Sequence, residues 1–180
     1  MVAYFFYYIS SMVQPQVIWL TGLSGAGKST IASHLAKSLG EKDIKTFVID
    51  GDVLRESFGH DLSFSKEDRS KNVARAIHLA NQKLHEGFVV IVALISPFSA
   101  DRDFARTTLG SLFKEVYLST PLSECERRDP KGLYKKTRAG LISDMTGIDS
   151  PYEVPLQPEI ILDTSVLNIK ESVEKILSTI

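Results

Sequence analysis

Apolar and polar positions along this chain follow two spacings, one typical of buried strands and the other of amphipathic helices. Residues 17–20 and 88–95 are apolar runs, the pattern of strands buried on both faces of a parallel sheet. Residues 31–39 and about 65–86 carry apolar side chains at helical spacing, and Ser65 with Asp68 resembles a capping box. The pattern further predicts strands at 46–49, 115–118 and 160–162 and a helix at about 168–179.

Strand-like and helical runs alternate throughout most of the chain, which predicts an α/β fold with a central parallel β-sheet and helices on both faces. No repeat or linker interrupts residues 17–180, so we expect them to form a single domain with a full hydrophobic core. Residues 1–16 are an N-terminal extension. Its role stays open between an extra edge strand, a contact surface and an upstream extension that precedes a start at Met12.

Composition and charge limit which binding partners and which cellular compartment we expect for this protein. The formal net charge is −1, which gives no sign of a nucleic-acid binder. The apolar run at residues 2–9 is too short to span a bilayer and lacks the basic start of a signal peptide, so no membrane association is expected. A single cysteine excludes an internal disulfide and fits a reducing compartment, from which we expect a cytoplasmic protein.

The segment 22–30 carries the strongest chemical signal. It reads GLSGAGKST, which fits the phosphate-binding pattern G-x-x-x-x-G-K-[ST], and it stands between a predicted strand and a predicted helix. An ordinary glycine-rich turn would leave its lysine and serine as coincidences. We therefore expect main-chain N–H groups and Lys28 to hold the phosphates of ATP, and the Ser29 hydroxyl to bind Mg²⁺. The ATP-binding residues predicted are Gly22, Leu23, Ser24, Gly25, Ala26, Gly27, Lys28, Ser29 and Thr30.

Ligands of parallel α/β sheets bind beyond the carboxyl ends of the strands. This rule draws attention to Ser96 and to the sequence Asp50-Gly51-Asp52, which follows the second predicted strand. An Asp-Gly-Asp sequence also suits a turn or helix cap. Beside a phosphate-binding loop we favour an active-site role for both carboxylates.

A further group of polar residues could bind an anionic substrate. Arg69 and Asn72 share a helix face, and a guanidinium such as that of Arg55 binds phosphate or sulfate in a bidentate way. Spacing alone favours solvated salt bridges with Asp68 or Glu56 instead.

The segment 124–138 is rich in arginine and lysine and is broken by Asp129-Pro130 and Gly132. A mobile basic loop of this kind can close over a polyphosphate and exclude water, although a solvated charged surface would have the same composition.

Several segments together resemble the adenylylsulfate kinase family. They occur in the family's order and cover nearly everything after residue 16, which makes the resemblance far more specific than the phosphate-binding loop alone. They are GLSGAGKST at 22–30, DGDVLR at 50–55, FSKEDRSKNV at 64–73, ISPFSADRDFAR at 95–106, PLSECERRDPKGLYKKTRAG at 121–140 and TGIDSPYE at 146–153.

The resemblance implies a P-loop NTPase-type three-layer sandwich with a basic lid at about 127–146. It implies transfer of a phosphoryl group from ATP to the 3′-hydroxyl of adenylylsulfate, with Mg²⁺ as cofactor, in a homodimer. Lys28, Asp52 and Ser96 would be catalytic, with Asp52 the candidate base, and Ser29 and Asp50 would lie at the metal. Around adenylylsulfate the resemblance places Asp52, Arg55, Phe64, Arg69, Asn72, Ile95, Ser96, Lys131 and Met145.

Two of these positions need comment. Ser96 corresponds to a residue that the family labels as a phosphoserine intermediate. We interpret it as a positioning or hydrogen-bonding residue, because direct transfer between two bound nucleotides needs no covalent carrier. Met145 stands where the family usually has a phenylalanine that covers the adenine opposite Phe64, so we expect looser substrate binding.

Two other functions remain open at this point. Another small P-loop kinase, acting on a nucleoside monophosphate or a metabolite hydroxyl, would share the loop, the sheet and the lid. A nucleotide-binding switch or non-catalytic regulator would share the loop, but the chain has no guanine-recognition motif and keeps Lys28 and Asp52.

Overall fold

The computed structural model describes residues 13–58, 62–63 and 65–180, and within them five strands form one parallel sheet. The strand order is β2-β3-β1-β4-β5, so the strand that leads into the phosphate-binding loop lies at the centre. The strands are β1 (Val17–Gly22), β2 (Thr46–Asp50), β3 (Val89–Ala93), β4 (Phe113–Leu118) and β5 (Ile160–Leu162).

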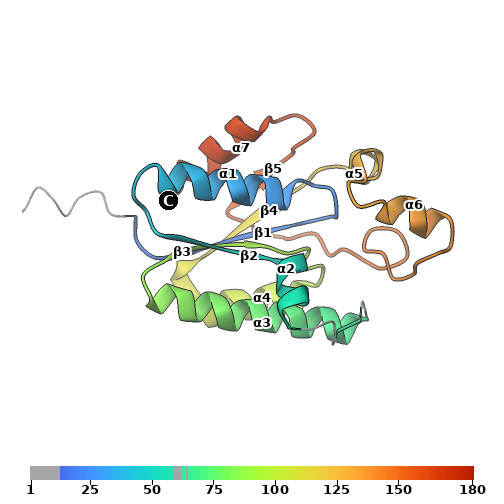
Figure 1. The fold of residues 1–180 in the computed structure, drawn as a ribbon, viewed down its shortest axis with the longest axis horizontal. Coiled ribbons are helices and arrows are strands. Elements are labelled where there is room, and N and C mark those ends of the chain that lie inside the picture. The colour runs from blue at the N-terminus through green and yellow to red at the C-terminus, as the bar shows by residue number, and fades with distance from the viewer. Residues whose placement is uncertain (1–12, 59–61, 64) are drawn as a thin grey trace, which may run out of the picture.

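Helices cover both faces of this sheet (Figure 1). On one face α1 (Lys28–Gly40) and α7 (Ile169–Leu177) pack on inward residues such as Ile18 and Ile91. On the other face α3 (Lys66–His85) and α4 (Ser99–Leu109) pack on Trp19 and Val92. Alternate residues of each central strand therefore enter different cores, which explains why these strands are apolar throughout. The prediction of a three-layer α/β sandwich is confirmed.

The start of α3 shows how local sequence sets a helix boundary. The Ser65 hydroxyl caps the helix by accepting from the Asp68 N–H at 3.2 Å. The other half of a capping box would require the Asp68 carboxylate to turn back to Ser65. Instead, Asp68 Oδ2 accepts from the main chain and the hydroxyl of Ser63, at 2.9 and 2.7 Å. The cap prediction is thus half right, and the displaced carboxylate braces the preceding loop.

Several helices lie outside those predicted from the sequence, among them α4, and two of them lie in the basic segment that we expected to be a loop. In the basic segment, two helices are separated at Asp129, whose carboxylate accepts from the main-chain N–H groups of Tyr134 and Lys135 at 3.1 and 3.0 Å. Asp129 therefore caps the second of these helices and does not prevent a helix from forming. The short helices are α2 (Gly51–Ser57), the 3₁₀ turn η1 (Gly110–Leu112), α5 (Leu122–Arg128) and α6 (Leu133–Arg138).

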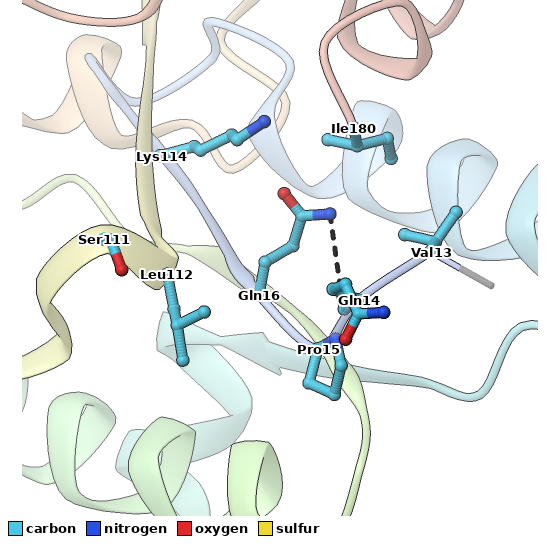
Figure 2. A pocket seen from close by; sticks show the side chains of 8 residues that line it. All are labelled: Val13, Gln14, Pro15, Gln16, Ser111, Leu112, Lys114 and Ile180. Atoms are coloured by element: carbon cyan, nitrogen blue, oxygen red, sulfur yellow. Dashed lines mark hydrogen bonds between the residues drawn. The ribbon is translucent and has the colours of Figure 1, made fainter. Parts of the chain in front are cut away.

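The two ends of the sheet differ in what they offer a ligand. Where β1 and β4 begin, an open pocket of about 450 Å³ lies between Val13, Gln16, Leu112 and Ile180 (Figure 2). Lys114 at its edge donates a hydrogen bond to the Thr179 carbonyl. The other, carboxyl end of the sheet carries the phosphate-binding loop, α2 and the segment of α5 and α6 (Figure 1). None of the helices in the described part of the chain has the length and apolar character that a membrane span requires.

Candidate active site

The phosphate-binding loop joins the central strand β1 to α1. At Gly25 the backbone has φ +78°, and a Cβ atom there would lie 2.9 Å from the Cys125 carbonyl oxygen. Gly27 caps α1 with φ +96°, again in the left-handed region. Only glycine adopts these conformations at low cost in so little space. The loop is therefore folded so that its main-chain N–H groups and the N-terminus of α1 can approach an anion.

Lys28 points back into this loop. Its Nζ donates to the carbonyl oxygens of Gly22 and Leu23, at 2.9 and 2.7 Å. Burial disfavours the charged ammonium and lowers the pKa of Lys28 to about 8. An anionic phosphate placed here would favour the protonated form, so the site is suited to bind negative charge.

Ser29 and Asp50 meet beside the loop. The Ser29 hydroxyl donates to Asp50 Oδ2 at 2.6 Å, although the residues belong to α1 and β2. Asp50 Oδ1 also accepts from the Asp52 N–H at 2.9 Å and so caps α2. The helix-cap and active-site interpretations of Asp50 are therefore compatible. A hydroxyl and a carboxylate next to a phosphate site are the hard oxygen ligands that Mg²⁺ prefers, so the residues present fit this ion.

Asp52 and Lys131 connect the two sides of the site. Asp52 lies in the first turn of α2, and Lys131 lies between α5 and α6. The two side chains form an ion pair, with about half of each side chain exposed. The basic segment thus reaches across the cavity to the candidate base, as a lid would.

Arg69 and Asn72 lie on the buried face of α3. Arg69 Nη1 donates to Thr146 Oγ1 at 2.6 Å and Nη2 to the Asp144 carbonyl, which fixes the segment that follows α6. Asn72 is only 4 % exposed, and its Oδ1 has no hydrogen-bond partner among the described residues. An unpaired buried acceptor is costly unless a ligand satisfies it. Arg55 completes the group from α2, where its Nη1 donates to the Ser63 carbonyl at 3.0 Å.

All of these side chains line one cavity of about 630 Å³, a volume suited to a small-molecule ligand. The phosphate-binding loop forms one part of its wall, and the residues after β2 and β3 form another. The predicted site residues that it brings together are Ser24, Gly25, Gly27, Lys28, Ser29, Thr30, Asp50, Asp52, Arg55, Arg69, Asn72, Ile95, Ser96 and Lys131.

A sequence model of the adenylylsulphate kinase family matches residues 14–163. The chain belongs to the adenylylsulfate kinase family. It is 54 % identical over 166 residues to the adenylyl-sulfate kinase of Pseudomonas aeruginosa, covering 92 % of this chain and 85 % of the relative. The structure resembles that of a Mycobacterium tuberculosis APS kinase in complex with AMPPNP and APS, with a TM-score of 0.88 and 43 % identity over 92 % of this chain and 96 % of the other.

Other kinases share only the fold. A gluconokinase from Sinorhizobium meliloti has a TM-score of 0.59 at 18 % identity, over 93 % of this chain and 92 % of its own. At this identity the likeness concerns the fold alone. The identities to adenylylsulfate kinases are far higher, so the family is distinguished by sequence and not by fold.

Among the described residues, one substrate position implied by the family resemblance, Met145, is not part of the cavity wall. Phe64 lies outside the described residues. Met145 is 8 % exposed and packs in the core with Tyr134, between the two residues that Arg69 contacts. Its proposed role as a wall of the adenine site stays a prediction.

A second cavity of about 520 Å³ adjoins the phosphate-binding loop on the side of α7. Gly27 and Thr30 line both cavities. Arg128 Nη2 donates to the Thr164 carbonyl at 2.7 Å, and the Thr164 hydroxyl donates to the Ala26 carbonyl at 2.9 Å. The sequence reasoning missed Thr164, although it follows β5 and the rule of strand carboxyl ends would have found it.

Proposed function

We propose that this member of the adenylylsulfate kinase family transfers the γ-phosphoryl group of ATP to the 3′-hydroxyl of adenylylsulfate. The products are ADP and 3′-phosphoadenylylsulfate, and the hydroxyl proton is released. One observation supports this most directly. A single cavity is lined by six residues of the phosphate-binding loop together with two carboxylates, three arginines and an amide oxygen that has no hydrogen-bond partner among the described residues. Phosphoryl transfer requires such a phosphate grip beside a group that orients the acceptor hydroxyl.

The residues divide this work. Main-chain N–H groups of the loop and Lys28 bind the phosphates of ATP and stabilise the charge that develops during transfer. Asp52 orients the acceptor hydroxyl and takes its proton late, because the transition state is loose. Arg55, Arg69 and Asn72 bind the phosphosulfate end and the ribose of adenylylsulfate. These assignments are supported by the shared cavity and by the family's motifs.

Mg²⁺ fits beside Ser29 and Asp50, whose oxygens lie 2.6 Å apart. When bound, the ion would neutralise phosphate charge. The proposed lid would exclude water, since water competes with adenylylsulfate as the acceptor of the phosphoryl group. Lys131 reaches Asp52 from the lid, and such closure would exclude water from the cavity. We further propose that the second cavity takes the base and ribose of ATP, because it continues from the phosphate-binding loop at Gly27 and Thr30.

Product identification tests the proposal. The protein is mixed with Mg²⁺, γ-labelled ATP and either adenylylsulfate, AMP or a sugar acid. We expect label on adenylylsulfate alone, and chelation of Mg²⁺ should abolish the transfer. Label on AMP or the sugar acid in place of adenylylsulfate would establish another small kinase. ATP binding without transfer to any acceptor would support a regulator.

The assembly and the compartment belong to the same proposal. We propose a homodimer in the cytoplasm, on the family resemblance and on the single buried thiol of Cys125. Light scattering of the purified protein measures the assembly. A Thiobacillus denitrificans APS kinase, 30 % identical over 93 % of this chain and 29 % of its own, is hexameric, so a dimer is not the only assembly among similar proteins.

A further inference from the structure

Ser96 lines the substrate cavity in a backbone conformation that serine seldom adopts. Its φ angle is +44°, in the left-handed region, and the residue is 2 % exposed. A non-glycine residue persists in this region only when its surroundings fix it. The hydrogen bonds to Ser96 therefore identify the residues that stabilise this conformation.

Arg102 fixes the main chain of Ser96. Its Nη1 donates to the Ser96 carbonyl at 2.7 Å, and its Nη2 donates to the Glu153 carbonyl at 2.6 Å. The guanidinium is itself held, because Nε pairs with Glu115 at 2.8 Å. Arg102 is buried in α4 and is not among the described residues that line the cavity. It holds the Ser96 loop from outside the binding site.

Trp19 fixes the side chain. Its indole Nε1 donates to Ser96 Oγ at 3.0 Å, from the fully buried centre of β1. An indole N–H can only donate, whereas a serine hydroxyl can donate and accept. Ser96 Oγ is therefore the acceptor in this contact, and its own proton is left for another partner. The described residues provide no hydrogen bond that accepts this proton.

We propose that Trp19 is a positioning residue that fixes the Ser96 hydroxyl as a hydrogen-bond donor to the acceptor nucleotide in the cavity. The proposal rests on the proposed function. It adds that Ser96 donates, and the nucleotide accepts, in the hydrogen bond between them. The partner is an oxygen or ring nitrogen of adenylylsulfate that carries a lone pair. The same geometry opposes a phosphoserine intermediate, because a nucleophilic serine needs a base to accept its proton, and an indole N–H cannot do so.

A double-mutant cycle tests the proposal in the full chain. Trp19→Phe keeps an aromatic ring near Phe113 but removes the N–H donor together with part of the ring, and Ser96→Ala removes the hydroxyl. Each substitution should raise KM for adenylylsulfate about threefold to tenfold, the range of one hydrogen bond, and leave KM for ATP unchanged. The double variant should equal Ser96→Ala, since Trp19 acts through the hydroxyl alone. Effects that multiply would overturn the proposal, because they would show that Trp19 acts independently of Ser96.

Phe113→Leu serves as the matched control. It disturbs the packing of the Trp19 ring, whose centroid is 5.8 Å away, and leaves the N–H donor in place. It should lower Tm with KM for adenylylsulfate unchanged. A rise in KM equal to that of Trp19→Phe would assign the effect to packing and overturn the proposal.

Fluorescence gives a readout that does not depend on turnover or on a folded Trp19 variant. Trp19 is the sole tryptophan, so tryptophan emission reports on the surroundings of this one indole. Adenylylsulfate added without ATP should shift the emission of the parent protein and shift that of Ser96→Ala less. Equal shifts would overturn the proposal. If the parent protein forms no 3′-phosphoadenylylsulfate, the proposed function itself fails, which the product assay detects separately.

Discussion

Tyr134 of α6 donates a hydrogen bond from its hydroxyl to the main-chain oxygen of Ser24 in the phosphate-binding loop, at 2.9 Å. The tyrosine is buried, so this bond between the basic segment and the phosphate-binding loop is shielded from solvent. The position of the lid and the shape of the loop are thereby coupled. An enzyme that must exclude water during phosphoryl transfer benefits from such a coupling.

Tyr134→Phe should lower the free energy of unfolding by about 1 kcal/mol, because the buried Ser24 carbonyl loses its donor. It should also weaken ATP binding, since the loop is no longer braced from the lid. Thermal unfolding with and without ATP measures both effects. Tyr117→Phe is the control, because that ring packs on Tyr152 and no described residue hydrogen-bonds its hydroxyl. Equal losses in the two variants would contradict a specific role for the bond.

Asp52→Asn should separate catalysis from stability. We expect kcat to fall about 10²-fold to 10⁴-fold, the range for a positioned general base. Tm should stay close to that of the parent, because the ion pair with Lys131 is half-exposed and such pairs contribute little. Steady-state kinetics and thermal unfolding of one preparation give both values. A near-normal kcat would show that Asp52 is not the general base of the reaction.

The lowered pKa of Lys28 predicts a pH dependence of ATP binding. Burial shifts this pKa from 10.5 to about 8, so the free protein loses the ammonium as pH rises through about 8. Phosphate binding needs the charged form, and ATP affinity should therefore fall by up to about tenfold per pH unit above this value. Calorimetric titration with ATP across that range measures it. Lys28→Arg is the control, since a guanidinium stays charged and its weaker binding should not vary with this titration.

The same group affects stability with the opposite sign. Lys28 in the unfolded chain has its ordinary pKa of 10.5, so between about pH 8 and that value the unfolded state binds more protons. The free energy of unfolding contributed by this group should then increase with pH across that window. Denaturant titrations of the parent and of Lys28→Met at several pH values would show the difference. A contribution that decreases with pH would contradict the lowered pKa of Lys28 in the folded protein.

Arg102→Met should destabilise the protein by about 3–5 kcal/mol, because it leaves the buried Glu115 carboxylate with only its longer contact to Arg106, at 3.4 Å. The matched control is Arg127→Met, which breaks a pair between Glu124 and an arginine that is 73 % exposed. That change should cost at most about 1 kcal/mol. Denaturant unfolding compares the two variants directly, and similar losses would show that Arg102 is less buried or less engaged than its contacts indicate.

Met145→Ala should cost about 2–5 kcal/mol of stability, as expected when a buried methionine leaves a cavity. Met145→Phe distinguishes the two interpretations of this position. If Met145 forms a wall of the adenine site, phenylalanine should lower KM for adenylylsulfate. If it serves only the core beneath the lid, the larger ring should lower Tm with no gain in affinity.

The sequence determined the order of the elements, the parallel sheet and the phosphate-binding loop. Each of these depends on signals within one short segment, such as the apolar run before Gly22 or the lysine and serine that open α1. The phosphate-binding motif and the rule for strand carboxyl ends selected the loop residues, Asp50, Asp52 and Ser96. The other predicted cavity residues, such as Arg69 and Lys131, were implied by the family resemblance and not by their spacing. The short helices of the lid escaped prediction, since Asp129 could equally break a helix or cap one.

Only the tertiary structure decided which side chains hold the site together. Trp19 and Ser96 are separated by 77 residues, as are Arg69 and Thr146, while Tyr134 and Ser24 are separated by 110. A periodic pattern tells that a tryptophan or an arginine is buried, but its partner depends on how distant elements pack. Hydrogen bonds are directional and effective only near 3 Å, so the contacts of a buried polar group are fixed by three-dimensional approach and not by position in the chain.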